Sequence, residues 1–385
     1  MKMQTSQWGW AAQAVLWVGA MGAAVAPSCA QSGPSTWGAY VTADTEAWSN
    51  GVPVLDLDGT WSKGYRQRAG TQAAYVTARA EVGAALPWLR PADGSAWRVG
   101  AVARVDGTAR LSGQAAQALY HYQSRTDPDA PVTLDAHSDV LYWTGKGVTV
   151  HTPSVSVAGF KLDMTFDHLK LNRLRHLRSE GFVRYNANDT YSYAGTVRDD
   201  SSRTEALFMA PPASDGTGQA VSLALGWTRP LDAPATGGWL ASRWMPDRMT
   251  LRVDDAWSRL RWNGINGDDA VLLSDVAELG DARINGQYTR RNVTERIPVS
   301  TQLQAEWGGA SGRWSVRVKN RVGLWQGWLG WQSAGPLSWS VAAEPFAGAL
   351  QLGLDWRGLR ASVMTDRLDN GAHARGAQLS WIGAF

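Results

Sequence analysis

The sequence predicts an all-β protein: an antiparallel up-and-down transmembrane β-barrel of about 16 strands, with even counts from about 12 to 18 compatible with its length. Three observations predict this fold. Many segments alternate apolar and polar residues with period two, as strands with one apolar and one polar face do. Tryptophan is abundant, at 22 residues. The chain also ends on such an alternating segment, which supplies a last strand to close a barrel.

The composition excludes two other classes of protein. After residue 30 no run of about 18 apolar residues occurs, which excludes a helical membrane protein. Charged residues make up 18% of the chain, and the 44% of hydrophobic residues are diluted among polar ones, so that the mean hydropathy is −0.27. The net charge is only +3 without any block of like charge, so nucleic-acid binding is not expected.

The N-terminal 30 residues have the pattern of a cleavable secretory signal peptide. Lys2 precedes an apolar stretch from Ala11 to Ala26, and Ser28-Cys29-Ala30 forms a small-residue cleavage site. We expect cleavage after Ala30, which leaves residues 31–385 as a single barrel domain without cysteine. The alternatives are an uncleaved anchor or a lipid attached to Cys29.

The alternation is clearest in the C-terminal third of the chain. In Leu350–Trp356 the even positions are apolar and the odd ones are polar or glycine, and Trp314–Lys319 and Met249–Asp254 repeat the pattern. Charged residues stand in mid-strand on the polar face, where a wet lumen solvates them. Tryptophan recurs at predicted strand ends, as an aromatic girdle requires: Trp97, Trp227, Trp307, Trp314, Trp356 and Trp381.

The last segment carries a resemblance. Leu379, Trp381 and the terminal Phe385 share one face of a predicted final strand. This strand resembles the assembly signal of bacterial outer-membrane β-barrels, although it matches no particular family. The resemblance implies a protein exported to the outer membrane of a Gram-negative bacterium. It implies the barrel-assembly machinery, outer-membrane lipid and lipopolysaccharide as partners.

Glycine- and asparagine-rich dipeptides predict short turns at Asn50-Gly51, Gly308-Gly309 and Asp369–Gly371. Longer polar stretches predict extracellular loops at Ser124–Pro131, Asn186–Thr204, Pro211–Gly218 and Asn263–Asp269. The segment Asp163–Glu180 fits neither a period of two nor one of 3.6. It is predicted to be a strand that runs into a loop, or a short helix folded into the lumen.

The leading functional hypothesis is a porin-like channel for small solutes, because charged rings in a lumen set ion selectivity. Alternatively, these charges pair with one another and fill the lumen, which suits a closed structural or export-associated barrel. The remaining hypotheses are an integral outer-membrane hydrolase and a soluble periplasmic β protein. The predicted lumen-lining residues are Arg98, Arg104, Asp106, Arg252, Asp254, Arg317, Lys319 and Asp355.

No catalytic motif, metal-binding motif or cofactor-binding motif is evident around the six histidines. Each histidine is expected in a loop or the lumen, and neither catalytic residues, a metal nor a cofactor are predicted. The basic cluster Lys170–Arg178 is either a solvated loop or a site for anionic lipid headgroups or solutes. Trp325, Trp328 and Trp331 are either girdle residues or an aromatic slide for sugars.

Overall fold

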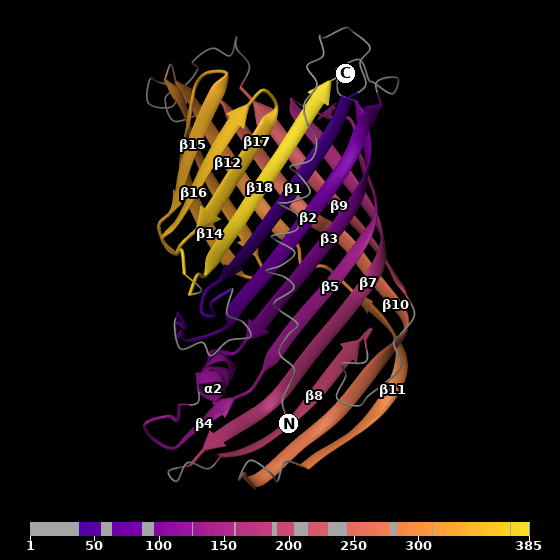
Figure 1. The fold of residues 1–385 in the computed structure, drawn as a ribbon, viewed down its shortest axis with the longest axis vertical. Coiled ribbons are helices and arrows are strands. Elements are labelled where there is room, and N and C mark those ends of the chain that lie inside the picture. The colour runs from indigo at the N-terminus through magenta and orange to yellow at the C-terminus, as the bar shows by residue number, and fades with distance from the viewer. Residues whose placement is uncertain are drawn as a thin grey trace.

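The computed structural model describes residues 38–54, 64–86, 96–124, 126–157, 159–186, 191–203, 215–229, 245–277, 283–309, 311–369 and 371–384. Within these residues it holds one continuous sheet of 18 strands, which closes on itself (Figure 1). The predicted signal peptide and Phe385 lie outside the described residues. The sheet is antiparallel throughout, as the sequence predicts.

Fourteen of the strands form the closed ring. In ring order they are β1 (Gly38–Ser49), β2 (Gln72–Leu86), β3 (Trp97–Leu111), β5 (Ser138–His151), β7 (Phe160–Tyr185), β9 (Gly216–Thr228), β10 (Arg248–Ala277), β12 (Ser300–Gly309), β13 (Gly312–Arg321), β14 (Leu324–Ser333), β15 (Leu337–Glu344), β16 (Ala349–Trp356), β17 (Leu359–Thr365) and β18 (Ala374–Ala384). Fourteen is an even number within the predicted range of about 12 to 18, and it is two below the predicted count of about 16.

Strand β1 closes the ring by pairing with β18, from Gly38 opposite Ala384 to Trp48 opposite Ala374. Because antiparallel partners share a face, this pairing fixes which side of the last strand meets the lumen. Leu379 and Trp381 of the predicted assembly signal lie on the outer face of β18, across from Ala43 and Val41. Gly38, the first described residue of the barrel, and Ala384, the last, therefore lie at the same end of the ring, and we call these two residues its termini.

The walls of the barrel are unequal in height. Strand β7 has 26 residues and β10 has 30, whereas β17 has only seven. The long strands run beyond the ring at the end away from the termini (Figure 1). There they pair with three strands that lie outside the ring, β4 (Val132–Asp135), β8 (Tyr191–Ser201) and β11 (Arg283–Glu295). We call this part of the sheet the extension.

Two small elements complete the described fold. Helix α2 (Gly113–Ser124) follows β3 and buries Ala115, Ala116 and Ala118. Its start is capped by Ser112, whose Oγ accepts a hydrogen bond of 2.9 Å from the Ala115 amide. Strand β6 (Val155–Val157) forms a hairpin with the start of β7 at the end where the termini lie. No helix among the described residues is long and apolar enough to cross a membrane.

The segment Asp163–Glu180 is wholly strand, inside β7. The alternative of a short helix in the lumen is therefore wrong. Its irregular spacing has a physical cause: Thr144 pairs with Arg173 but the next residue, Gly145, pairs with Leu171, so Asn172 is an extra residue in a β-bulge. The lumen-facing positions are odd-numbered before the bulge and even-numbered after it.

Two predicted loops are also strand. Asn263–Asp269 lies inside β10, where Gly264 has φ +67° beside a second register shift. Asn186–Thr204 contains β8. Both are polar because they belong to the extension and not because they are loops. Of the other predicted loops, Ser124–Pro131 connects α2 to β4, whereas Gly216–Gly218, at the end of Pro211–Gly218, are already strand in β9. Gly308-Gly309 ends β12 at a tight turn into β13.

The outer face of the ring is apolar. On β7, β9 and β10, four successive outer rungs (sets of residues paired across these three strands) carry only apolar side chains. They are Phe160–Trp227–Met249, Leu162–Leu225–Leu251, Met164–Leu223–Val253 and Phe166–Val221–Trp257. On the opposite wall Leu350, Leu352 and Leu354 of β16 are exposed on the same face. Such a band is what a lipid environment requires.

The predicted girdle tryptophans lie near the strand ends at the end of the ring with the termini, and Trp307 pairs there with Trp314. The other predicted tryptophan group, Trp325, Trp328 and Trp331 of β14, is divided between the outer and the inner face of the barrel. Trp325 is 71% exposed, while Trp328 is 3% exposed in the lumen and packs against Trp48 at a ring distance of 6.0 Å. An aromatic slide along this strand is therefore excluded, and Trp328 belongs to the interior.

Candidate functional site in the barrel lumen

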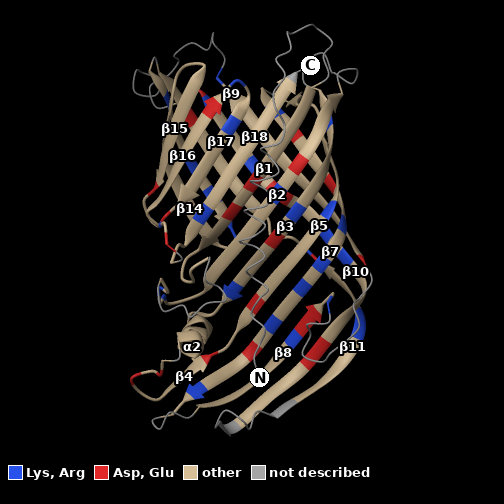
Figure 2. Cartoon of the chain, in the orientation of Figure 1, with Lys and Arg blue, Asp and Glu red and all other residues tan. Residues whose placement is uncertain are grey.

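Charged residues are spaced along many of the strands of the barrel (Figure 2). The structure places all eight predicted lumen residues on the inner face. Arg252, Asp254, Arg317, Lys319 and Asp355 line one polar cavity. Of the other three, Arg98 lies with its guanidinium 5.4 Å from the centre of the Tyr40 ring, and Arg104 and Asp106 form ion pairs across the lumen.

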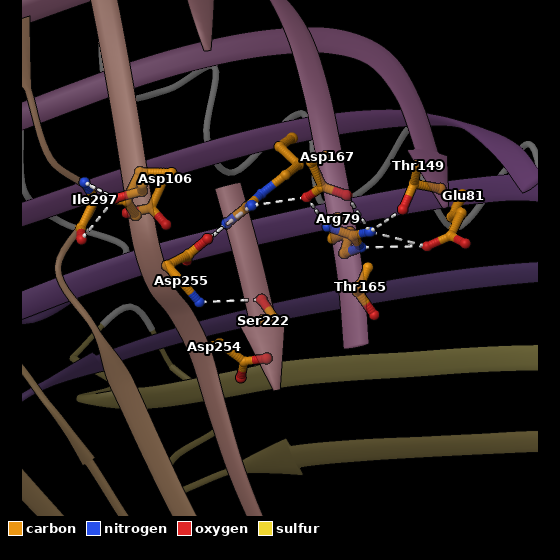
Figure 3. A network of polar contacts seen from close by, with 12 residues as sticks. Arg79, Glu81, Asp106, Thr149, Thr165, Asp167, Ser222, Asp254, Asp255 and Ile297 are labelled. Carbon is orange, nitrogen blue, oxygen red and sulfur yellow. Dashed lines mark hydrogen bonds and ion pairs between the residues drawn. The ribbon is translucent and has the colours of Figure 1, made fainter. Parts of the chain in front are cut away.

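Arg104 of β3 is the hub of these ion pairs. It forms two hydrogen bonds of 2.9 Å with the two carboxylate oxygens of Asp255 on β10, and one of 3.0 Å with Asp167 on β7. Its guanidinium also lies 5.2 Å from the centre of the Trp143 ring. Figure 3 shows Asp255 and Asp167 converging from different strands. One arginine thus ties together three strands of the ring.

Arg79 of β2 extends the network. It holds Asp167 with bonds of 2.6 and 3.0 Å, and it also reaches Glu81 at 3.1 Å and Thr149 at 3.1 Å (Figure 3). Arg79, Glu81 and Asp167 were not among the lumen residues predicted from the sequence. A signal was present for two of them, because in β2 Thr77, Arg79 and Glu81 alternate with small apolar residues.

Asp255 was not predicted either, for a structural reason. Strict alternation puts it on the outer face, because Asp254 is on the inner one. The pairing between β9 and β10 shifts between Val253 and Trp257, and Asp255 has φ +55°. Its amide donates to Ser222 Oγ at 3.0 Å. This bulge turns both neighbouring carboxylates toward the lumen (Figure 3), at a backbone conformation that is costly for a residue other than glycine.

A second set of charge pairs joins the remaining walls. Arg321 of β13 bonds Asp106 of β3 at 2.5 Å, and both side chains are about 95% buried or more. Lys319 bonds Glu46 of β1, which also accepts a hydrogen bond from the Tyr75 hydroxyl. A buried charge is tolerated only when it is paired in this way.

Two apolar clusters fill the lumen alongside the charge pairs. The first cluster is assembled around Trp143 and Trp262, which are 0% and 2% exposed. Its members come from β3, β5, β7, β9, β10 and β11 and the residues just after β11: Val102, Leu141, Trp143, Leu169, Leu171, Leu174, Ala220, Leu260, Trp262, Ile265, Val293 and Ile297. The second cluster includes Trp48 of β1, Tyr75 of β2, and Leu324 and Trp328 of β14. These clusters contact strands around the ring, so the interior is packed at their level.

The polar cavity lies on the other side of this packed level, toward the termini. Its volume is about 440 Å³. Glu46, Lys319 and Gln326 line its inner limit, and Arg313, Ser338 and other residues next to the turns at the end of the ring also line it. The cavity is thus a chamber in one half of the barrel.

His151 joins a carboxylate to a hydroxyl. Its Nε2 is 2.5 Å from Glu81 Oε1, and its Nδ1 is 3.0 Å from Thr165 Oγ1. The Tyr40 ring packs edge-on against the imidazole at 6.0 Å. A hydroxyl, an imidazole and a carboxylate in this order are the components of a nucleophilic triad. The sequence could not reveal them, because they come from three strands.

His176 lies in the extension and is held differently. Its Nε2 is 2.8 Å from Asp139 and its Nδ1 is 2.8 Å from Glu295. Burial opposes a charged imidazole, but the hydrogen bonds to these two carboxylates outweigh it and raise the pKa of His176 to about 9. The ring is therefore protonated at neutral pH and cannot serve there as a general base.

The structure also tests the prediction that each histidine lies in a loop or in the lumen. His168 is exposed on the outer face of β7, so its placement in a loop or the lumen is wrong. The cluster Lys170–Arg178 is divided by the bulge: Lys170 and Arg175 face outward, whereas His176 and Arg178 face inward. Among the described residues no group of three or more His, Cys, Asp or Glu side chains is placed to hold a metal ion.

The fold and lumen define the class of this protein. A closed antiparallel barrel with an apolar outer face and charged inner face satisfies its backbone hydrogen bonds within a membrane. The chain is therefore a β-barrel of the bacterial outer-membrane type, with 14 strands in the ring.

Comparison with known proteins yields no family. No protein-family model and no curated protein matches the chain. A solved structure, the outer membrane protease OmpT from Escherichia coli, aligns over 93% of this chain and 99% of its own, at 9% sequence identity and a TM-score of 0.22. The proteolytic function in that name belongs to OmpT, and the function of this chain is argued from its own residues.

Proposed function

We propose that the protein is a closed outer-membrane barrel that does not conduct solutes. The observation that carries this proposal is the ion-pair network centred on Arg104, which crosses the lumen to Asp167 and Asp255. A porin needs its inner charges to face water along a continuous path. Here the charges at mid-lumen face one another.

The energetics favour a lumen that stays shut. Asp255 is 1% exposed and Asp106 is 2% exposed, so separating either from its arginine leaves a buried charge without compensation, which costs about 3–5 kcal/mol. Several such pairs would have to break together for a solute to pass. The apolar clusters would have to be displaced as well, and packed interiors resist such displacement.

The orientation follows from the connections. The connections that carry α2, β4, β8 and β11 all lie at the end of the ring away from the termini (Figure 1). Longer connections are typical of the extracellular side of such barrels. The 440 Å³ cavity then lies toward the periplasm, and the extension stands outside the cell.

Planar-bilayer recording of the refolded full-length chain tests this function. We expect no conductance steps, in membranes where an open porin measured in parallel gives them. Steady single-channel steps from the folded protein, confirmed as folded by its heat-sensitive mobility in gels, would contradict the closed barrel.

A hydrolase is the second candidate, and the Glu81–His151–Thr165 chain favours it. In this candidate Thr165 Oγ1 attacks an ester carbonyl while His151 accepts its proton and Glu81 orients the imidazole. The bond to the alcohol then breaks as His151 returns the proton to the departing alcohol, and water activated by His151 hydrolyses the acyl-threonine. Hydrolysis of nitrophenyl esters by the folded protein tests it. The activity should fall at least about 100-fold in both His151→Ala and Thr165→Val, and not in His168→Ala. Equal activity in all of these variants would exclude this site.

A further inference from the structure

A belt of outward-facing basic residues begins where the apolar band of the long wall ends. The outermost apolar rung of β7, β9 and β10 is Phe166–Val221–Trp257. The next rung is His168–Gln219–Arg259, and the one beyond is Lys170–Thr217–Arg261. The change from apolar to polar and basic side chains is complete within one rung on all three strands.

The belt continues onto the neighbouring strand. Lys146 of β5 pairs directly with Lys170 of β7 and therefore points to the same side. We call Lys146, Lys170, Arg259 and Arg261 the basic arc. All four are exposed. Three of them form no ion pair with any described residue, and Lys170 bonds Asp215, with more than 60% of each side chain exposed.

The position of the arc selects its ligand. Neighbouring strands are about 4.8 Å apart, so the three spacings from Lys146 to Arg261 place cations along about 14 Å of one tilted rung, just beyond the apolar band. Thr217 and Gln219 add exposed hydrogen-bonding groups between them. A row of cations and donors directly above a lipid-facing surface matches anionic groups that are fixed at the headgroup level of a membrane.

The side of the apolar band on which the basic arc lies determines which membrane leaflet the arc meets. The arc lies on the side of the apolar band away from both termini, next to the extension. In the orientation derived above, this is the outer leaflet. We infer that the basic arc binds the phosphate groups of an outer-leaflet glycolipid, with phosphorylated lipid A as the headgroup class. This inference rests on the orientation of the barrel but not on whether its lumen is closed or catalytic.

Binding of diphosphoryl lipid A to the full-length chain in a neutral detergent, counted by native mass spectrometry, tests the inference. In Lys146→Gln/Lys170→Gln/Arg261→Gln the affinity should fall at least about tenfold, because several charge-assisted contacts are removed. Asp215→Asn removes the carboxylate that competes for Lys170 and should tighten binding. The matched control Lys161→Gln/Arg357→Gln removes two cations near the opposite end of the ring and should leave the affinity unchanged.

Three results would overturn the inference. The first is that the triple variant, shown to be folded by its heat-sensitive mobility in gels, binds lipid A as tightly as the parent protein does. The control pair could lose as much affinity as the triple variant. Inorganic phosphate at millimolar concentration could displace the lipid completely, which would make the arc a site for free anions. Conductance of the parent protein would refute the closed lumen and leave all three of these tests valid.

Discussion

Arg104 and Asp255 are 151 positions apart in the sequence, and they form two parallel hydrogen bonds of 2.9 Å across the barrel. The bidentate geometry matches the planar guanidinium to the planar carboxylate. It depends on the bulge that turns Asp255 inward. This pair joins β3 to β10, which are not neighbours in the ring, and so braces the lumen internally.

Removal of this brace should destabilise the barrel. In Arg104→Ala both Asp167 and Asp255 lose a partner inside the lumen, and the free energy of unfolding should fall by about 3–5 kcal/mol. Urea titration in detergent micelles, followed by tryptophan fluorescence, measures it. Arg313→Ala, which removes a half-exposed arginine from a rim ion pair with Glu306, should cost less than about 1 kcal/mol. Equal losses in the two variants would contradict the role assigned to Arg104.

The Glu46–Lys319 pair permits a charge swap. Each side chain is less than one fifth exposed, so Lys319→Glu should cost at least about 2 kcal/mol by opposing two carboxylates. Glu46→Lys/Lys319→Glu restores opposite charges and should recover at least half of that loss. The same urea titration measures both. A double variant no more stable than the single one would show that Tyr75, and not the ion pair, determines stability at this position.

Gly147 should not tolerate a side chain. A Cβ built on it would lie 1.9 Å from the carbonyl oxygen of His168 on the neighbouring strand. Since that atom belongs to the backbone, Gly147→Ala forces β5 and β7 apart, and we expect a loss of about 1–3 kcal/mol with a lower refolded fraction in the gel mobility assay. Gly226→Ala is the control, because its nearest atom would be 3.9 Å away. Normal refolding of the Gly147 variant would contradict so close an approach of these two strands.

The extension should lose stability in alkali. The pKa of His176 is about 9 in the folded protein and 6.5 in the reference state. A raised pKa stabilises the fold fully below pH 6.5, and the contribution disappears as the pH rises to about 9. It amounts to at most about 3–4 kcal/mol. Hydrogen exchange of β7 and β11 amides should therefore accelerate over that range in the parent protein. In His176→Gln this extra acceleration should be absent, whereas His168→Gln should behave as the parent does.

The regular part of the fold follows from the sequence because strand alternation assigns faces locally. All eight predicted lumen residues, from Arg98 to Asp355, lie on the inner face for this reason. The failures occur where a bulge interrupts the alternation. Asp255 was missed because its bulge reverses its face, and Asp163–Glu180 was ambiguous because Asn172 is an extra residue.

The pairing of side chains could not be predicted at all. His151, Glu81 and Thr165 belong to three strands, and their meeting depends on the register of each strand against the next. The choice between an open and a packed lumen also depends on ring size and on partners such as Arg321 and Asp106, 215 positions apart. Alternation indicates which side chains enter the lumen, but not what they meet there.

The bulge at Asn172 has a consequence for how this gene can vary. It acts as a change of parity: odd positions face inward before it and even positions after it. Deletion of Asn172 would remove the bulge and leave both faces as they are, because Leu171 would still point into the barrel and Arg173 away from it. A single-residue insertion after Leu174 would instead exchange the two faces of the rest of β7, so that Arg175 would point into the barrel and His176 away from it. The two halves of this strand can therefore vary in sequence independently, and the strand should accept the loss of its bulge residue but not the gain of a further one.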